Sequence, residues 1–333
     1  MTAAEAGRIP RRRSLGARAK AVLSSRAFQI CAFAAAVALG GFLLYRALRD
    51  YSPAELLAAI MAVPAGGLAF AALFAAASYL TLTLFDYLAL RCAGKPLRWR
   101  QAALASFSSL SVGHTIGFAG LSSGAIRYRF YARWGLSAAE VAQVVLYCGL
   151  TVAMGLCTLC GIMLLVDPAT GSRMIGLPPG AVLALAGAAL AIPALYLALA
   201  AIPERNLRRQ VWRLRRPPLW IAAAQVTVGT VNFAFVAACL HQVLRHLGDT
   251  GYPAVAAAYV AANAATLVSH VPGGLGVVET VVQHLIPGAA LIGPLLVFRI
   301  VYFLTPLALG LSVFAVSEAV FRHAKGRTDQ PQV

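Results

Sequence analysis

The stretch Val268-Ser-His-Val-Pro-Gly-Gly-Leu-Gly-Val-Val-Glu279 interrupts an otherwise apolar region, between a run that begins at Val255 and a run that ends at Ile286. A Pro-Gly-Gly-x-Gly cluster cannot continue a helix regularly, because proline lacks a backbone N–H and glycine favours no single conformation. At membrane depth, irregular backbone is tolerated only where protein or a water-filled cavity satisfies its polar groups. The stretch predicts either a kink or loop between short helices, or a re-entrant hairpin whose tip lines a substrate cavity. We favour the hairpin, with its tip at Pro272, Gly273, Gly274 and Gly276.

The composition of the whole chain is that of a membrane protein. Of 333 residues, 60% are hydrophobic and only 12% are charged, and the mean hydropathy is +0.76. Several apolar runs are long enough to cross about 30 Å of hydrocarbon, so we expect an all-α polytopic membrane protein. A net charge of +17 would suggest nucleic acid as the partner of a soluble protein. Here the basic residues lie between apolar runs, so membrane topology and anionic lipid explain them and no nucleic-acid partner is expected.

Hydropathy predicts six membrane-spanning helices and a second broken segment. The glycine-rich break lies within residues 101–126, where we expect another re-entrant hairpin with its tip at Gly113, Gly117, Gly120 and Gly124. Residues 167–180 read as a loop rich in proline and glycine. The six predicted spans are residues 28–48, 66–90, 137–165, 181–202, 218–242 and 289–320.

Shorter helices are predicted at the membrane surface. Ser52 and Glu55 have the spacing of a capping box, with proline at the first helical position, as do Ser137 and Glu140 at the start of a span. Residues 204–216 carry six arginines and place apolar side chains on one face, which predicts a basic amphipathic surface helix.

The distribution of lysine and arginine predicts the topology. If both broken segments return to the side they came from, both termini are cytoplasmic and almost all of the 28 basic residues are cytoplasmic. If residues 101–126 crossed the membrane instead, the arginine-rich segment 204–216 would lie outside. The exceptions in the favoured topology are Arg46, Arg49, Arg173 and Arg245 on the outside and Arg299 within the membrane.

The same topology implies an internal symmetry. Each half contains a span, a second span, a broken segment and a third span, and the two halves start from opposite sides of the membrane. This order is typical of the inverted-topology repeats of transporters. We therefore predict one transmembrane domain at 28–322 with repeat halves at about 28–166 and 180–321, flanked by a cytoplasmic basic arm at 1–27 and a cytoplasmic tail at 323–333.

Glu279 and Arg299 are charged residues inside predicted membrane segments. An isolated charge there is costly, so each needs a partner, and the helical rise places both at overlapping depths. We predict that they pair, either as a structural ion pair or as a polar step for a lipid headgroup. If they pair, reversing both charges together should preserve folding.

Asp86 and the arginines after the first break form a second set of candidates. Asp86 could pair with Arg127 or Arg129, although Arg91 at the interface is slightly favoured. Arg127 and Arg129 follow the glycine-rich break, and arginine matches phosphate in a bidentate geometry. Arg133 is expected to belong to an ordinary positively charged surface cluster.

The remaining polar groups suggest no cofactor. His270 flanks the predicted second tip; a packing role is favoured, and a place on the polar path is the alternative. Cys157 and Cys160 fall within an apolar helix, where small packing residues are expected and thiolates are disfavoured. The sequence has no metal-ligand spacing, Walker loop or dinucleotide fingerprint, so no metal or cofactor is expected.

Several motifs resemble one known family. Asp86-Tyr-Leu-Ala-Leu-Arg91, Gly117-Phe118 with Ser123-Gly-Ala-Ile-Arg-Tyr-Arg-Phe-Tyr131, Ser269 to Glu279, and Arg299-Ile-Val-Tyr302 to Pro306 resemble motifs of the transmembrane region of lysylphosphatidylglycerol synthase/flippase proteins, which are similar to multiple peptide resistance factors. The resemblance covers about residues 28–322. It departs at His114-Thr115, where relatives carry asparagine.

The resemblance implies a lipid-related role. Large members of the family fuse this region to a synthase domain that transfers an aminoacyl group to phosphatidylglycerol. The sequence ends at Val333 without that domain, so we expect the flippase-like part and no enzyme activity. The expected function is binding or translocation of an anionic or aminoacylated phospholipid across a bacterial-type inner membrane. The alternatives are presentation of lipid to a separate synthase, or a non-transporting envelope scaffold.

Overall fold

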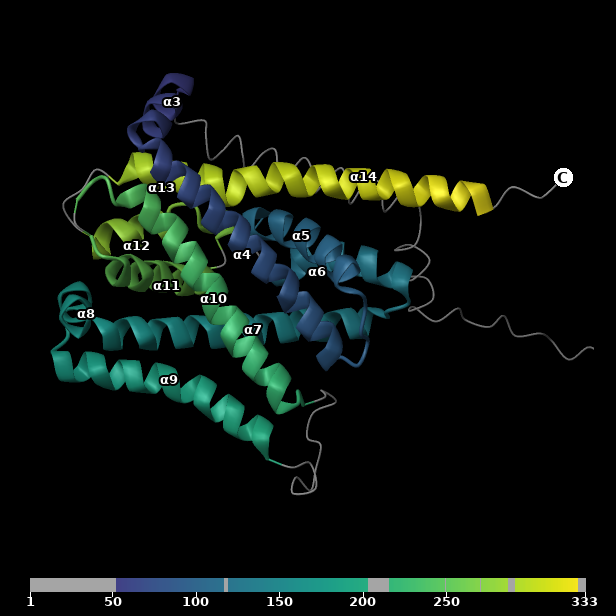
Figure 1. The fold of residues 1–333 in the computed structure, drawn as a ribbon, viewed down its shortest axis with the longest axis horizontal. Coiled ribbons are helices and arrows are strands. Elements are labelled where there is room, and N and C mark those ends of the chain that lie inside the picture. Colours follow the sequence, from purple (N-terminus) through teal and green to yellow (C-terminus); the bar gives the residue numbers. More distant parts are fainter. Residues whose placement is uncertain are drawn as a thin grey trace, which may run out of the picture.

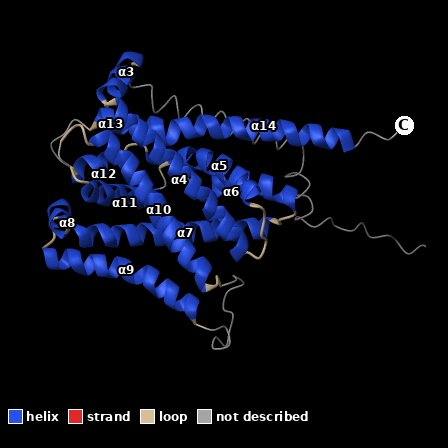
Figure 2. Ribbon diagram, viewed as in Figure 1, coloured by secondary structure: helices blue, strands red, loops and turns tan. Residues whose placement is uncertain are grey.

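The computed structural model describes residues 52–116, 119–202, 216–248, 250–269, 271–286 and 291–328. The predicted basic arm, the predicted span at 28–48 and all but the last residue of the predicted surface helix at 204–216 lie outside these ranges, as does His270. Within the described ranges every regular element is helical (Figure 2).

Six helices in the described part are long and apolar enough to cross a membrane. Five coincide with predicted spans. The sixth is α11, which we expected to form one arm of the second broken segment; it runs unbroken for 18 residues, or about 27 Å of helical rise. The six are α4 (Ala65–Cys92), α7 (Ala138–Val166), α9 (Pro179–Ala201), α10 (Leu219–Leu244), α11 (Tyr252–Ser269) and the composite helix over residues 292–321.

Both predicted capping boxes are present. At α3 (Pro53–Ala62), Glu55 accepts from the Ser52 backbone N–H at 2.7 Å, and Ser52 Oγ accepts from the Glu55 N–H at 3.2 Å. These bonds lower the pKa of the Glu55 carboxyl. At α7, Ser137 and Glu140 exchange the same two bonds. Each box satisfies two backbone donors that a helix start leaves free.

The prediction of a loop at residues 167–180 is wrong, because a short helix, α8 (Pro168–Ile175), lies there. Asp167 caps it by accepting the Thr170 N–H at 3.0 Å, which lowers the pKa of the Asp167 carboxyl. Proline occupies the first helical position, and Gly176 ends the helix with a φ of 69°. The turn-forming residues at 167–180 therefore mark the two ends of a helix.

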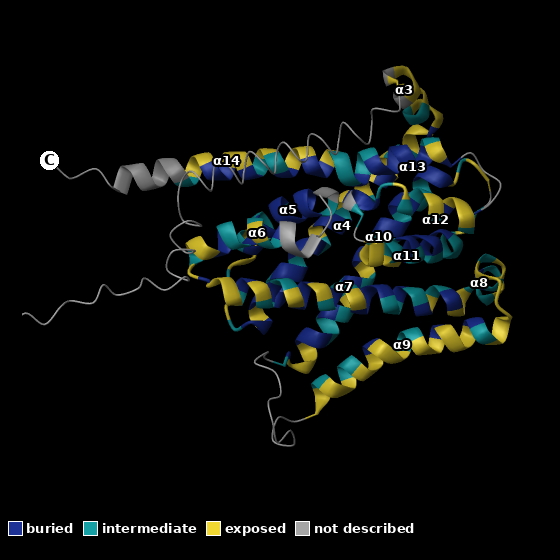
Figure 3. Cartoon of the chain, turned by 180° about the vertical axis from the view of Figure 1, so that it is seen from behind, coloured by how far each residue is buried: buried dark blue, intermediate teal, exposed yellow. Residues whose placement is uncertain are grey.

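The long helices form a bundle in which α7, α9 and α14 run in roughly the same direction, with α14 on the opposite side from α9, and α4 and α10 cross them obliquely (Figure 1). The most extensive helix–helix contacts are those of the pairs α4–α10, α7–α10 and α7–α9. The helix pair α5–α6 (Trp99–Ile116 and Ala119–Tyr131) lies toward one end of the bundle. The helix pair α11–α12, with α12 at Val277–Leu285, lies toward the other end (Figures 1 and 3).

Two glycines lie at a close contact between the long helices α7 and α10. A Cβ added to Gly155 of α7 would lie 2.4 Å from the carbonyl carbon of Gly229 in α10. A Cβ on Gly229 would lie 2.5 Å from the Thr151 carbonyl oxygen. Small residues at such crossings are the usual means by which membrane helices approach closely.

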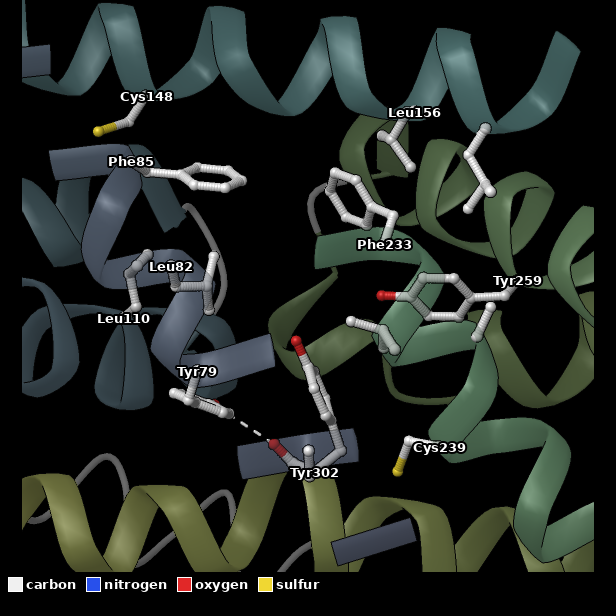
Figure 4. Close-up of a cluster of buried hydrophobic side chains, with 14 of the residues drawn as sticks. Tyr79, Leu82, Phe85, Leu110, Cys148, Leu156, Phe233, Cys239, Tyr259 and Tyr302 are labelled. Carbon is white, nitrogen blue, oxygen red and sulfur yellow. Dashed lines mark hydrogen bonds between the residues drawn. The ribbon is translucent and has the colours of Figure 1, made fainter. Parts of the chain in front are cut away.

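An aromatic core fills the centre of the bundle (Figure 4). Tyr79 stacks obliquely on Tyr302 with ring centroids 5.5 Å apart, and Tyr302 stacks on Phe298 at 5.6 Å. Tyr259 meets Phe298 edge to face at 6.3 Å. These rings join α4 and α11 to the last helix. The last helix also carries Arg299, one member of the predicted pair with Glu279.

The last span consists of α13 (Ile292–Arg299), a π-helical turn η4 (Ile300–Leu304) and α14 (Thr305–Thr328). Helical backbone continues to Thr328, beyond the predicted end near residue 320, because no proline interrupts the sequence before Pro331. A π-turn inserts one residue into the helical ladder and is common at functional sites. Here the turn follows directly after Arg299.

Candidate functional site

The second break lies where the sequence predicts it, between α11 and α12. Its backbone forms a short turn, η3 (Pro272–Gly274), and φ is +60° at Gly273, +58° at Gly274 and +80° at Gly276. These left-handed values are strained for any residue with a side chain. At Gly274 an added Cβ would also lie 2.8 Å from Thr266 Oγ1. The turn packs against α5, so the second break meets the other helix pair inside the molecule.

Arg299 and Glu279 form the predicted pair at this break. Arg299 Nε and Nη2 donate to the two carboxylate oxygens of Glu279, the second at 2.7 Å. The same guanidinium donates to the carbonyl oxygens of Gly273 and Gly274, each at 3.0 Å. Arg299 therefore satisfies two acceptors that the irregular turn removes from the helical ladder.

Glu279 is the more accessible member of this pair. Its side chain is 25% exposed, against 9% for Arg299. One carboxylate oxygen also accepts the Gly276 N–H at 3.0 Å, which caps the start of α12. Glu279 is thus fixed by the turn on one side and by Arg299 on the other, and its remaining surface is open.

A second charged pair, Asp86 with Arg127, is fully enclosed. Arg127 donates from Nη2 to one Asp86 oxygen at 2.7 Å and from Nε to the other at 2.9 Å. Asp86 is 0% exposed and Arg127 is 2% exposed. Asp86 also accepts from Tyr131 Oη at 2.6 Å and Cys148 Sγ at 3.2 Å, while Ser123 Oγ accepts from Arg127 Nη1 at 2.7 Å.

The prediction that Asp86 pairs with Arg91 is wrong, and the alternative partner, Arg127, is the one observed. Arg91 lies over the Tyr87 ring, 4.5 Å from its centroid, and donates to the Tyr87 hydroxyl at 2.5 Å. Asp86 instead faces the core, whereas Arg91 remains exposed. The physical reason is the direction in which each side chain leaves α4, since residues five apart do not share a helix face.

A third charged cluster joins α6 and the short turn η1 (Ala132–Trp134) to α14. Glu318 pairs with both Arg129 and Arg133. Arg133 lies at the surface, and in addition its ion pair with Glu318 crosses from η1 to the last helix. Both ion pairs form with one carboxylate because Arg129 and Arg133 are four residues apart and therefore project toward the same side.

The predicted tip of the first break requires correction. Gly113, Gly120 and Gly124 lie within the helical backbone of α5 and α6, and Gly117 lies outside the described residues. Glycine is tolerated in these helices because small residues allow close helix packing in membranes. The interruption between α5 and α6 is therefore much shorter than the glycine-rich stretch suggested.

A neutral polar cluster between α4, α10 and the last span was missed from sequence. Asn232 Oδ1 accepts from Ser78 Oγ at 2.8 Å and Thr81 Oγ1 at 2.9 Å, and Ser78 Oγ lies 2.9 Å from the Tyr302 hydroxyl. Ser78 and Thr81 were visible as polar residues on one part of α4, but a single asparagine in an apolar helix gives no sign of its partners. Among the described residues, no group of three or more histidine, cysteine or acidic side chains is placed to hold a metal.

Comparison with known proteins identifies the family of the chain. The chain matches the family model described as "Lysylphosphatidylglycerol synthase TM region" over residues 33–310. It is 32% identical over 234 residues to "Uncharacterized protein slr0712" of Synechocystis sp., covering 69% of this chain and 73% of that protein. It is 25% identical over 306 residues to "Inner membrane protein YbhN" of Escherichia coli, covering 86% and 87%. The chain is therefore a multi-pass membrane protein of the lysylphosphatidylglycerol synthase TM region family.

Proposed function

We propose that this protein binds phospholipid headgroups within the membrane and passes them between the leaflets, with Glu279 and Arg299 as the central polar step. The observation that carries the proposal is a charged pair mounted on a broken helix inside an apolar bundle. Intramembrane charges are costly, face the interior of a bundle, and mark substrate and ion pathways. The lipid-related family supports the same function.

The chemistry of the pair favours a headgroup that carries both signs of charge. A guanidinium binds phosphate in a bidentate geometry, and a carboxylate binds an amine. A lipid phosphate would take the place of Glu279 as the partner of Arg299. An aminoacyl ammonium group would take the place of Arg299 as the partner of Glu279. The substrate class that fits is a phosphatidylglycerol-like lipid, either anionic or aminoacylated, whose acyl chains remain in the bilayer.

The two other charged clusters would have different roles. Asp86 and Arg127 are too enclosed to meet a headgroup in this conformation, so we assign them to holding α6 against α4. Arg129 and Arg133 share Glu318, and Arg133 is the more exposed of the two, so Arg133 is the candidate for headgroup contact at the cytoplasmic end. This assignment uses the topology with re-entrant helix pairs and cytoplasmic termini.

A reconstitution experiment tests the proposal. The purified full chain is placed in vesicles with fluorescent phosphatidylglycerol or lysylphosphatidylglycerol, and dithionite reports how fast inner-leaflet label reaches the outside. We expect rapid loss of inner-leaflet fluorescence with the unsubstituted protein. Glu279→Gln should slow it by about tenfold or more, the effect of losing roughly 1.4 kcal/mol of charged hydrogen bonding in the transition state.

A matched substitution separates the site from general damage. Arg173→Gln changes an exposed arginine on α8, far from the break, and should leave the rate unchanged. Translocation that persists in Glu279→Gln and Arg299→Gln would contradict the central polar step. Absence of translocation for every lipid would contradict transport itself and favour presentation of lipid to a separate synthase.

A further inference from the structure

An apolar groove lies between α5 and α14, on the outside of the bundle. Its volume is about 420 Å³. Val316 and Val320 on its α14 side are 63% and 60% exposed, so the groove opens sideways at the surface. The residues that line it are Leu104, Ser312, Val313, Val316, Ser317, Val320 and Phe321.

One end of this groove carries positive charge. Phe321 in the groove lies beneath the Arg133 guanidinium, 4.7 Å from it, and Glu318 follows directly after Ser317 in the lining. Glu318 balances only one of the two arginines that it holds, Arg129 and Arg133. The cluster therefore has a net positive charge, and Arg133 is its most accessible member at 28% exposure.

The length of the groove matches half of a bilayer. From Ser312 to Phe321 the helix rises about 14 Å, close to half of the roughly 30 Å hydrocarbon thickness. An acyl chain that enters beside Arg133 would thus reach about the midplane. Its phosphate would lie at the charged end, where an arginine can take it in bidentate geometry.

At the other end of the bundle, protein fills the space between two neighbouring helices and leaves no comparable groove. Between α7 and α11, side chains of α7 such as Met163 face Pro253 and Ala254 at the start of α11. There α8 covers the gap with Gly171 and Met174. Among the described residues no surface helix covers the groove between α5 and α14 in this way.

We propose that the groove binds one acyl chain of an anionic phospholipid from the cytoplasmic leaflet, with the lipid phosphate held by Arg133. This site rests on the proposed function, because it names where the lipid docks before its headgroup enters the polar step. Arg129 stays with Glu318 when the phosphate takes Arg133, so the charges at the rim remain balanced.

Photo-crosslinking tests the site. The full chain carries p-benzoylphenylalanine in place of Val316, or in place of Leu73 on α4 as a matched control, since Leu73 is 59% exposed and lies in an apolar part of its helix. Both proteins are placed in vesicles of equal phosphatidylglycerol and phosphatidylcholine and irradiated, and mass spectrometry of the intact protein identifies the attached lipid. We expect phosphatidylglycerol to exceed phosphatidylcholine by about fivefold at position 316, the ratio given by roughly 1 kcal/mol per basic side chain near the bilayer surface. Position 73 should capture the two lipids equally.

Substitution of the charged end completes the test. Arg133→Gln should remove the preference at position 316, while Arg173→Gln should leave it intact, because Arg173 lies on α8 at the other end of the bundle. Equal capture of both lipids at position 316 would overturn the proposal. A crosslink from position 316 to residues 28–48 of the same chain would also overturn the proposal, because that predicted span would then occupy the groove.

The outcomes separate this site from the proposed function. Selective capture at position 316 without any translocation would support the groove and contradict transport. Translocation with unselective capture would support transport and contradict the groove.

Discussion

Arg299 bonds the carboxylate of Glu279 and, with the same guanidinium, two carbonyl oxygens of the glycine turn. The ion pair and the broken backbone are therefore one unit. Arg299 and Glu279 cannot exchange positions, because a carboxylate at position 299 could not donate to the carbonyl oxygens of Gly273 and Gly274. The geometry revises the expectation that reversal of both charges would preserve folding.

The first prediction concerns this double reversal. Glu279→Arg combined with Arg299→Glu should remain strongly destabilised, by about 3 to 5 kcal/mol, as when one partner of a buried pair is removed. Arg299→Lys should fall between this variant and the unsubstituted protein, because lysine keeps the charge but cannot contact the two Glu279 oxygens and the two carbonyl oxygens at once. Thermal unfolding in detergent, followed by size-exclusion chromatography, measures the order. Recovery of full stability in the double variant would refute the carbonyl contacts.

The second prediction concerns the enclosed pair on α4. Asp86→Asn removes the counter-charge of Arg127 and leaves a guanidinium unpaired in the core, so it should cost about 3 to 5 kcal/mol. Arg91→Gln, five residues away at the exposed end of α4, should change stability by no more than about 0.5 kcal/mol. The same unfolding assay compares them. Similar melting temperatures for the two variants would mean that Asp86 is not the partner that stabilises Arg127.

A third prediction follows from the glycine contact between α7 and α10. Gly155→Ala should destabilise the protein by about 1 to 3 kcal/mol, because its Cβ would meet the backbone of Gly229, which cannot move aside. Gly149→Ala on the same helix meets nothing within 4 Å and should be neutral or stabilising by up to about 1 kcal/mol. Melting temperatures of the two alanine variants give the comparison. A stable Gly155→Ala would show that α7 and α10 lie farther apart.

The sequence predicted those features that depend on the cost of exposing a group to lipid. Long apolar runs located five of the spans, and two intramembrane charges at similar depths located the pair of Glu279 and Arg299. It could not predict which side of α4 Asp86 faces, because depth along a helix does not determine the direction of a side chain. The contact of Asn232 with Ser78 was hidden for a related reason, since partners on different helices are chosen by tertiary packing. The same proline and glycine residues that suggested a loop at 167–180 equally suit the ends of a short helix.

The last prediction concerns Glu318, which holds two arginines at the rim of the groove. Glu318→Gln keeps the size of the side chain but removes its charge, so Arg129 and Arg133 lose their shared counter-ion. A lipid phosphate would then be the available anion, and retention of phosphatidylglycerol should rise by about fivefold, as expected for one more unbalanced charge near the bilayer surface. Native mass spectrometry of the purified protein with mixed phosphatidylglycerol and phosphatidylcholine measures this ratio. Glu55→Gln, which removes the exposed carboxylate that caps α3 without unpairing a basic side chain of the described residues, is the matched control and should leave the ratio unchanged. An unchanged ratio in Glu318→Gln would mean that the arginines serve only to attach α6 and η1 to α14.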